Sequence, residues 1–591
     1  MQESGSRCNR SPSASLGGAA SSILLGLILT ATFLVYARTL RFDFVHDDRG
    51  QIVENPAVHS WRFLPQYFKD HVWAGVEPEL AGNYYRPLFL LWLRLNNLCW
   101  GHDPWGWHLT TILLHIAATW LVYRLAQRVT RNPFSAAAAA GIFGLHPAHI
   151  EAVAWISGVT EPLLAVAFIS SFLWYLERFE SPHRARWGWG VSLLLYGLAM
   201  LAKETALVLP IILFSYEWLY GNGREAGSAP EARGRRALRA ARRAAPFLVL
   251  TLPYLVGRYL ALQGFSPAVT SLPFTSLVYT WPSLFLFWIR HLVWPAGLST
   301  YYDFPTVTRL TFQDFLLPAV GTLVVGLGLV LAVRKSRESV FASVWIFVPL
   351  LPLLNLRVFM RDDFAHDRYL YLPSVGLALL AGSALARLPD GTHKILGVPI
   401  RKAAILAAVL LSLSLSTVRQ SSYFANNLVF YQHCVASAPH NNDAKANLAV
   451  VLGEEGRYAE ALGLFQDIIR DDPVFWTAIY NTGYTHYRLG DYGKAEAHFL
   501  RAIEANPNKP QAYLYLGLTR LHLGRIEDAE KAVRQAIQIR PSGFGYHFAL
   551  GVILKTRADL PGAVAEFRQE LLYHPNQAAA EMQIQEIEAA R

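Results

Sequence analysis

The feature that most constrains the fold is a series of apolar segments that fills roughly the first 420 residues. Hydrophobic residues make up 53% of the 591-residue chain and charged residues only 16%, whereas soluble domains carry about a quarter charged residues. Apolar segments of about 20 residues can cross a bilayer as helices. The pattern predicts an all-α protein, in which a polytopic membrane helix bundle precedes a soluble helical part.

Basic residues between the apolar segments predict how the chain is oriented. The run 224–243 alone contains seven arginines, and cytoplasmic loops carry an excess of Lys and Arg. Two further apolar stretches, 86–100 and 275–296, contain polar residues. If both lie flat or re-enter the membrane, about eleven spans remain and nearly every basic loop is cytoplasmic. The net charge of +10 therefore reflects topology rather than nucleic-acid binding.

The cysteines indicate no disulfide framework, and the first apolar segment is either a membrane span or, as the alternative, a cleaved signal peptide. Three cysteines are far apart and form no CxxC pair, so they indicate no zinc site either. The first segment runs into Arg38 and Arg41 without a clear small-residue cleavage site. We therefore expect an uncleaved first span.

The chain beyond about residue 440 repeats with a period of 34 residues. Four positions keep this period: Pro473, Pro507, Pro541 and Pro575; Gly456, Gly490 and Gly524; Gly483, Gly517 and Gly551; Ala461, Ala495, Ala529 and Ala563. This period is typical of tetratricopeptide repeats, which stack into a solenoid with a concave binding surface. A folding platform or a dimer contact is the alternative role.

These patterns predict five regions. They are a cytoplasmic tail (1–19), the transmembrane domain (20–420) with its external loop and flat helices (39–105), a linker (421–440), four repeats (441–576) and a capping helix (577–591).

Unusual polar residues collect on the external side in this topology. Two adjacent acids, Asp47 and Asp48, follow the exit of the first apolar segment, and they could bind a cation, act as a base or simply be solvated. Charged residues near the bilayer are functional-site hypotheses by default. The others are Arg86, His146, His149, Glu151, Lys203, Glu204 and the segment 357–371. The repeats are expected on the same side, which favours a protein as substrate.

Five stretches in order resemble a known family. They are HDDRGQIVENPAVHS, NYYRPLFLLWLRLNNLCWGHDPWGWHLTTILLH, GLHPAHIEAVAWISGVTEPLL, LAKETALVLP and DRYLYLPSVGLALL. With the trailing repeats, the chain resembles the transmembrane-and-tetratricopeptide-repeat O-mannosyltransferases of the GT-C glycosyltransferase class. The resemblance covers almost the whole chain from about residue 40. It implies transfer of a sugar from a polyprenyl phosphate to Ser or Thr hydroxyls of exported proteins, without a metal or other cofactor.

The implied chemistry assigns roles to the polar residues. The acceptor hydroxyl needs a base, for which we choose Asp47, with Asp48 orienting the acceptor or the sugar. The departing phosphate needs fixed cations, for which Arg86, Lys203 and Arg368 are candidates. His146, His149, Glu151, Glu204 and Tyr369 are candidates for the sugar or acceptor site. Helix packing is the alternative for most of these residues, the histidines above all.

Several alternatives remain open at this point. The sugar is mannose or another hexose, the carrier dolichyl phosphate or a bacterial polyprenyl phosphate, and the membrane the endoplasmic reticulum or a bacterial inner membrane. The acceptor could instead be a glycan or a lipid. A non-catalytic scaffold that recruits partners through the repeats is the alternative outside enzymes. A transporter is disfavoured, because no repeated halves with interrupted helices are found.

Overall fold

The computed structural model describes residues 13–76, 82–177, 182–221, 232–265, 269–334, 336–360, 363–390, 393–395 and 397–590. The chain divides into two compact units, Met1–Ser437 and Ala438–Arg591. Within the described ranges both are built from helices, and the strands are confined to the two-residue pair β1 (Lys394–Ile395) and β2 (Val398–Pro399). The all-α prediction is confirmed.

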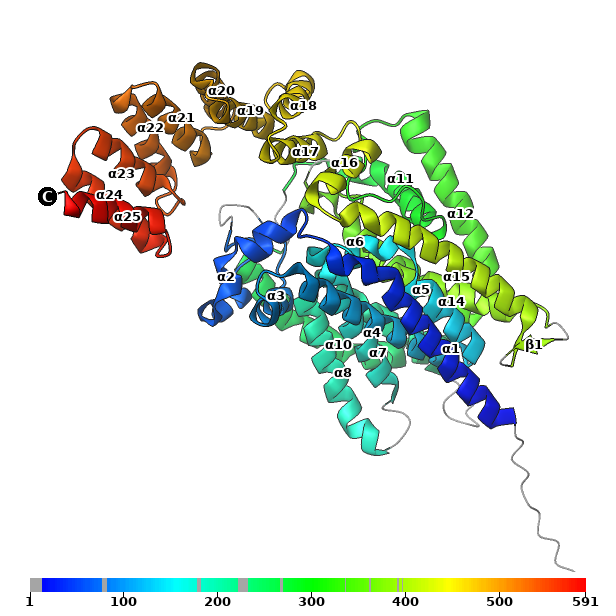
Figure 1. Cartoon of the computed structure of the whole chain (residues 1–591). Coiled ribbons are helices and arrows are strands. Elements are labelled where there is room, and N and C mark those ends of the chain that lie inside the picture. Colours follow the sequence, from blue (N-terminus) through cyan, green and yellow to red (C-terminus); the bar gives the residue numbers. More distant parts are fainter. Residues whose placement is uncertain are drawn as a thin grey trace, which may run out of the picture. The chain divides into compact units, whose positions relative to one another are not determined.

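The first unit is a bundle of mostly apolar helices (Figure 1), and short 3₁₀ or π-helical turns lie between some of them. Its helices are α1 (Ser13–Tyr36), α2 (Pro56–His59), α3 (Pro87–Trp100), α4 (Pro104–Thr130), α5 (Pro133–Gly144), α6 (Ile150–Val153), α7 (Thr160–Glu177), α8 (Pro182–Ala202), α9 (Leu209–Tyr220), α10 (Arg233–Leu262), α11 (Phe274–Val293), α12 (Leu317–Val333), α13 (Arg337–Phe347), α14 (Pro373–Ala386), α15 (Ile400–Ser421) and α16 (Asn427–Ser437).

Helix α5 lies at the centre of this bundle because its side chains are small. The five alanines 136–140 are fully buried, and α5 packs against α1, α4, α14 and α15. A Cβ added at Gly382 of α14 would lie 2.5 Å from the Ser135 carbonyl oxygen of α5. Small residues therefore let these helices approach closely, as they do in membrane bundles.

Seven helical segments in the described ranges are long and apolar enough to cross a membrane. They are Ser21–Arg41, Pro104–Thr130, Ile156–Glu177, Arg233–Leu262, Phe312–Ala332, Arg337–Leu354 and Ile400–Phe424. Three shorter apolar helices are Pro133–Gly144, Trp187–Ala202 and Pro373–Ala386. The two stretches expected to lie flat or re-enter are the helices α3 and α11. The count of about eleven spans stays a prediction.

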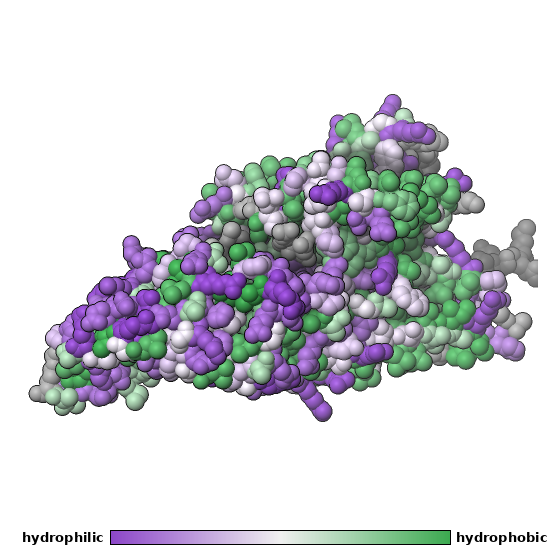
Figure 2. Space-filling model, turned by 90° about the horizontal axis from the view of Figure 1, so that it is seen from above, coloured by the Kyte–Doolittle hydropathy of each residue, from purple (hydrophilic) through white to green (hydrophobic). Residues whose placement is uncertain are grey.

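Apolar side chains remain on the surface of the first unit, as expected for a protein embedded in lipid. Helix α12 is the clearest case, because Leu323, Val324 and Leu327 are each more than half exposed. Figure 2 shows broad areas of hydrophobic residues on the face that it presents.

The second unit consists of four helix pairs and one further helix. Its helices are α17 (Asn442–Glu454), α18 (Tyr458–Asp471), α19 (Trp476–Arg488), α20 (Tyr492–Ala505), α21 (Pro510–His522), α22 (Ile526–Ile539), α23 (Tyr546–Thr556), α24 (Leu560–Tyr573) and α25 (Ala578–Ala589). The prediction of a tetratricopeptide-repeat solenoid is confirmed.

The periodic glycines have two physical causes in this unit. Gly456, Gly490 and Gly524 have positive φ in the turn inside each pair, where a side chain is strained. Ala558 takes the same position in the fourth pair, with φ of 68°. Gly517 lies where a Cβ would come within 2.4 Å of Val533, so it allows the paired helices to touch.

Candidate active site

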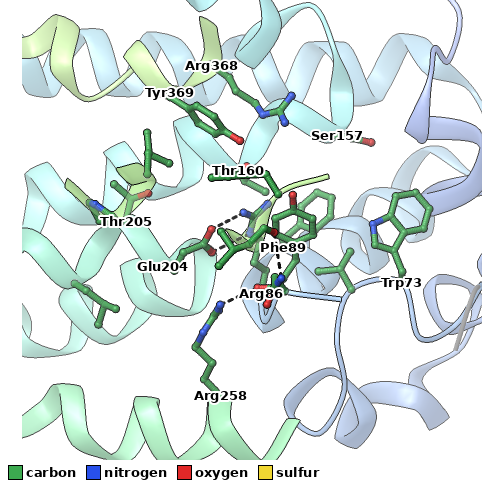
Figure 3. A pocket seen from close by; sticks show the side chains of 18 of the residues that line it. Trp73, Arg86, Phe89, Ser157, Thr160, Glu204, Thr205, Arg258, Arg368 and Tyr369 are labelled. Atoms are coloured by element: carbon green, nitrogen blue, oxygen red, sulfur yellow. Dashed lines mark hydrogen bonds and ion pairs between the residues drawn. The ribbon is translucent and has the colours of Figure 1, made fainter. Parts of the chain in front are cut away.

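Segments far apart in the sequence line one cavity of about 270 Å³ in the first unit (Figure 3). The loop before Arg49 contributes Asp47, the residue before α3 contributes Arg86, and the 3₁₀ turn Glu204–Val208 contributes Glu204. The 3₁₀ turn Asp367–Leu370 contributes Arg368 and Tyr369. Half of the ten residues proposed from the sequence therefore line one cavity.

The two adjacent acids have different surroundings. Asp48 is fully buried and accepts hydrogen bonds from the Val45 N–H (3.1 Å), the Ser157 N–H (2.8 Å) and the Ser157 hydroxyl (2.6 Å). Burial raises the pKa of Asp48 from 3.8 to about 7, although these hydrogen bonds oppose the shift. Asp47 lines the cavity, and its side chain is 31% exposed. Asp47 is thus the acid that a substrate can reach, whereas Asp48 fixes the loop to Ser157.

The two cavity arginines proposed from the sequence are each paired with a carboxylate. Arg86 donates to both carboxylate oxygens of Glu204, at 2.8 and 3.3 Å. Arg368 forms an ion pair with Glu151, whose other oxygen accepts from the Arg368 backbone N–H at 3.0 Å. Burial raises the pKa of Glu151 to about 7, against the effect of Arg368. These pairs hold both guanidinium groups at the cavity wall.

Lys203 lies behind the cavity wall. It is 2% exposed, its Nζ atom is paired with Glu161, and this atom lies 5.0 Å from the centre of the Tyr369 ring. Burial lowers the pKa of Lys203, and Glu161 opposes the shift. Lys203 therefore contacts Tyr369, which lines the cavity, and is not itself one of the lining residues.

His146 and His149 lie in the packed interior. His146 contacts the Leu292 carbonyl through Nε2 (3.1 Å), and its Nδ1 accepts from the Ala148 N–H (3.2 Å). The Nε2 atom of His149 is 2.7 Å from the Ser374 hydroxyl. The contacts of the two histidines are those expected if they serve helix packing. Glu151 does not line the cavity itself, but it is paired with Arg368, which does.

Arg258 of α10 also lines the cavity, although it is not among the residues predicted from the sequence. Its Nε donates to the Phe265 carbonyl (3.0 Å) and its Nη2 to the Asn83 carbonyl (2.8 Å). The residue is only 6% exposed, and its Nη1 has no hydrogen-bond partner among the described residues. The sequence offered one signal for this residue, which is the position of a charged side chain inside an apolar segment. Charged residues in such segments are costly and therefore indicate function.

The cavity has a polar and an apolar part. The polar part carries Asp47, Ser157, Thr160 and the arginines, and Figure 3 shows Arg86 and Arg258 together near Glu204. The apolar part is formed by Leu207, Leu255, Phe265, Leu353, Val358 and Phe359. The site is therefore suited to an amphipathic anion.

The described residues contain no group of three or more His, Cys, Asp or Glu side chains that could hold a metal ion. A reaction without a metal or other cofactor stays a prediction.

Comparison with known proteins gives matches for both parts of the chain. Residues 85–227 match the family described as dolichyl-phosphate-mannose-protein mannosyltransferase, and residues 480–544 match a tetratricopeptide-repeat family. The predicted resemblance is confirmed, because a mannosyltransferase-family segment precedes the repeats in one chain.

Similar proteins extend this similarity over most of the chain. Protein O-mannosyl-transferase Tmtc1 of Drosophila melanogaster is 26% identical over 93% of this chain and 79% of the relative. Protein O-mannosyl-transferase TMTC3 of Mus musculus is 25% identical over 89% of this chain and 61% of the relative. Tmtc2 of Drosophila melanogaster is 34% identical over 32% of this chain and 21% of its own length. The chain thus spans between about three fifths and four fifths of the first two relatives.

Proposed function

We propose that this chain, a relative of the protein O-mannosyltransferases, transfers a hexose from a polyprenyl phosphate to Ser or Thr hydroxyls of exported proteins. The observation that carries the proposal is the composition of the cavity. Two carboxylates line the cavity, and Glu204 is already paired with Arg86, whereas Asp47 has no arginine or lysine partner among the ion pairs of the described residues. Asp47 shares the cavity with Arg86, Arg258 and Arg368, and another part of the lining is apolar. The names of the similar proteins favour mannose as the sugar, and the description of the matching family favours dolichyl phosphate or a similar carrier as the donor.

The reaction follows from this arrangement as a direct displacement. The carboxylate of Asp47 takes the proton of the acceptor hydroxyl, and the hydroxyl oxygen attacks the anomeric carbon of the sugar. The bond between that carbon and the phosphate oxygen breaks, so the configuration inverts and the polyprenyl phosphate leaves as an anion. No acid is needed, because a phosphate is a good leaving group.

The arginines stabilise the phosphate before and after the displacement. Arg258 lines the cavity, and its buried Nη1 atom has no hydrogen-bond partner among the described residues, which makes it the first candidate for the phosphate oxygen. Arg86 and Arg368 are held by Glu204 and Glu151, so their guanidinium groups are fixed at the cavity wall before the phosphate binds. The apolar lining around Leu255 and Leu353 suits the first isoprene units.

The repeats are proposed to recruit the acceptor protein. Tetratricopeptide solenoids bind peptides on their concave surface, and the alternative of a glycan or lipid acceptor gives the repeats no such role. The cavity and the repeats are then expected on the lumenal or periplasmic side of the membrane. A scaffold without catalysis is disfavoured by the accessible Asp47 beside three arginines.

The experiment is transfer by the purified full-length chain in detergent. The donor is a radiolabelled polyprenyl-phosphate mannose, tested beside the glucose form, and the acceptors are a Ser/Thr peptide, an oligosaccharide and buffer alone. Label on the peptide hydroxyl supports the proposal. Label only on the oligosaccharide moves the function to the glycan alternative, and the absence of any transfer overturns it.

A further inference from the structure

Helix α16 and the residues just before it contact the loop that contains Asp47 and Asp48. This helix follows the last apolar segment by several residues. The Asp43 N–H donates to the Ala425 carbonyl (3.0 Å), just before α16 begins. The His46 N–H donates to the side-chain oxygen of Asn427 (2.8 Å), and the His46 Nδ1 atom is 3.0 Å from the Tyr431 hydroxyl. Residues 43–46 are therefore tied to 425–431 at three points.

His46 has a backbone conformation that needs such support. Its φ is 53°, in the left-handed region that residues other than glycine seldom adopt. Strained residues of this kind persist where their surroundings hold them, and they cluster at functional sites. The His46 ring packs against two aromatic rings, with its centre 5.6 Å from that of Phe430 and 5.4 Å from that of Trp155.

The turn at His46 decides where the next two side chains point. Asp47 lines the cavity and Asp48 is bonded to Ser157. The Nε2 atom of His46 is 3.6 Å from the nearer carboxylate oxygen of Asp47. A change in the conformation of His46 would therefore move the carboxylate that faces the substrate.

We propose that Asn427 and Tyr431 are positioning residues for Asp47, which act by holding His46 in its left-handed conformation. The proposal rests on the function proposed above, since it assigns Asp47 the role of the base. It also makes α16 part of the catalytic unit, and the first repeat helix, α17, begins only at Asn442. The helix that precedes the repeats in the chain is thus the same helix that contacts the loop containing Asp47.

The test compares variants that break the contact with one that keeps it. Asn427→Leu removes the acceptor of the His46 N–H, whereas Asn427→Asp keeps an oxygen at that position. Tyr431→Phe removes only the hydroxyl. Gln432→Ala is the control, because Gln432 is exposed on the same helix. The readouts are kcat and KM for transfer, binding of a polyprenyl-phosphate analogue, and amide hydrogen exchange of peptides covering residues 42–53.

We expect Asn427→Leu to lower kcat by about 10- to 100-fold, because a displacement of the base by about 1 Å has effects of this size. Tyr431→Phe should lower it by about 10-fold or less, since one hydrogen bond is lost. In both variants the amide hydrogens of residues 42–53 should exchange faster, and binding of the polyprenyl-phosphate analogue should be nearly unchanged. Asn427→Asp and Gln432→Ala should keep most of kcat.

Three results would overturn the proposal. The first is normal kcat and normal exchange in Asn427→Leu. The second is an equal loss of kcat in Asn427→Leu and Asn427→Asp. The third is a loss of kcat in Gln432→Ala equal to that in Asn427→Leu. Either result would mean that the helix is required and the contact with His46 is not. If the unchanged chain transfers no sugar, the function proposed above fails. The exchange rates alone then decide whether Asn427 holds the loop.

Discussion

The carboxylate of Asp48 accepts two hydrogen bonds from Ser157, one from the backbone N–H at 2.8 Å and one from the hydroxyl at 2.6 Å. These contacts join the loop after the first apolar segment to the 3₁₀ turn Ile156–Val159 before α7. With Asp48 committed in this way, the neighbouring Asp47 is the acid that faces the cavity.

The first prediction separates the roles of the two acids. Asp47→Asn should bind a polyprenyl-phosphate analogue normally and lose turnover by about 10²- to 10⁴-fold, because an amide cannot take the proton. Asp48→Asn should lower both turnover and thermal stability. The amide NH₂ group would face the Val45 N–H or the Ser157 donors, and a donor cannot accept the hydrogen bonds that the carboxylate accepts. Transfer rates, analogue binding and Tm in detergent measure this, and full turnover by Asp47→Asn would exclude it as the base.

The second prediction concerns pH and Asp48. Burial raises its pKa in the folded chain from 3.8 to about 7, so the folded state holds this proton more tightly than the unfolded state. The resulting stabilisation is fully present below about pH 4 and is lost as the pH rises to about 7. The Tm of the unchanged chain should thus decline more steeply over this range than the Tm of Asp48→Asn. Parallel curves for the two proteins would contradict the assignment.

The third prediction contrasts two arginines of the cavity. Arg258 has no carboxylate within ion-pair distance among the described residues, so Arg258→Ala should weaken analogue binding by about 10- to 100-fold, since a hydrogen bond to a charged group contributes about 1.5–3 kcal/mol. Arg86→Ala leaves Glu204 without its partner and should also reduce Tm. The double change Arg86→Met with Glu204→Gln should recover Tm but not binding. Equal Tm losses for both alanine variants would argue against this difference.

The fourth prediction concerns the boundary of the catalytic unit. A chain that ends at Ser437 keeps α16 and should still glycosylate a short peptide, whereas one that ends at Tyr423 lacks the contacts to His46. We expect the shorter chain to lose turnover by about 10-fold or more. Comparing both with the full chain, on a short peptide and on a folded acceptor protein, measures the contribution of the repeats. Equal activity of the two truncated chains on the peptide would contradict the prediction.

The fifth prediction tests the orientation in the membrane. With basic loops such as 224–243 in the cytoplasm, the chain end at Arg591 should be external. A reporter that is active only in the cytoplasm, fused after Arg591, should therefore be silent. The same reporter inserted in the 224–243 run is the positive control, and activity of the C-terminal fusion would exclude the topology of about eleven spans.

The sequence by itself determined the two kinds of helical architecture and the region of the site. The 34-residue period could be interpreted directly, because each repeat packs on its neighbours through local positions such as Gly517 against Val533. The apolar segments gave the membrane bundle, because lipid forces backbone groups to bond within a helix. Asp47 and Arg86 also stood out, since charges beside apolar segments are costly.

Only the tertiary structure decided how the site is assembled. Adjacent acids look alike in a sequence, and it is the left-handed turn at His46 and the contact with Ser157 that send Asp47 and Asp48 in different directions. The segment 421–440, expected to be a linker, contains α16, which packs within the first unit. Arg258 and the carboxylate partners of the other arginines depend in the same way on contacts between distant segments. Such contacts leave no periodic signal, because they are set by how whole helices pack and not by the residues next to them in the chain.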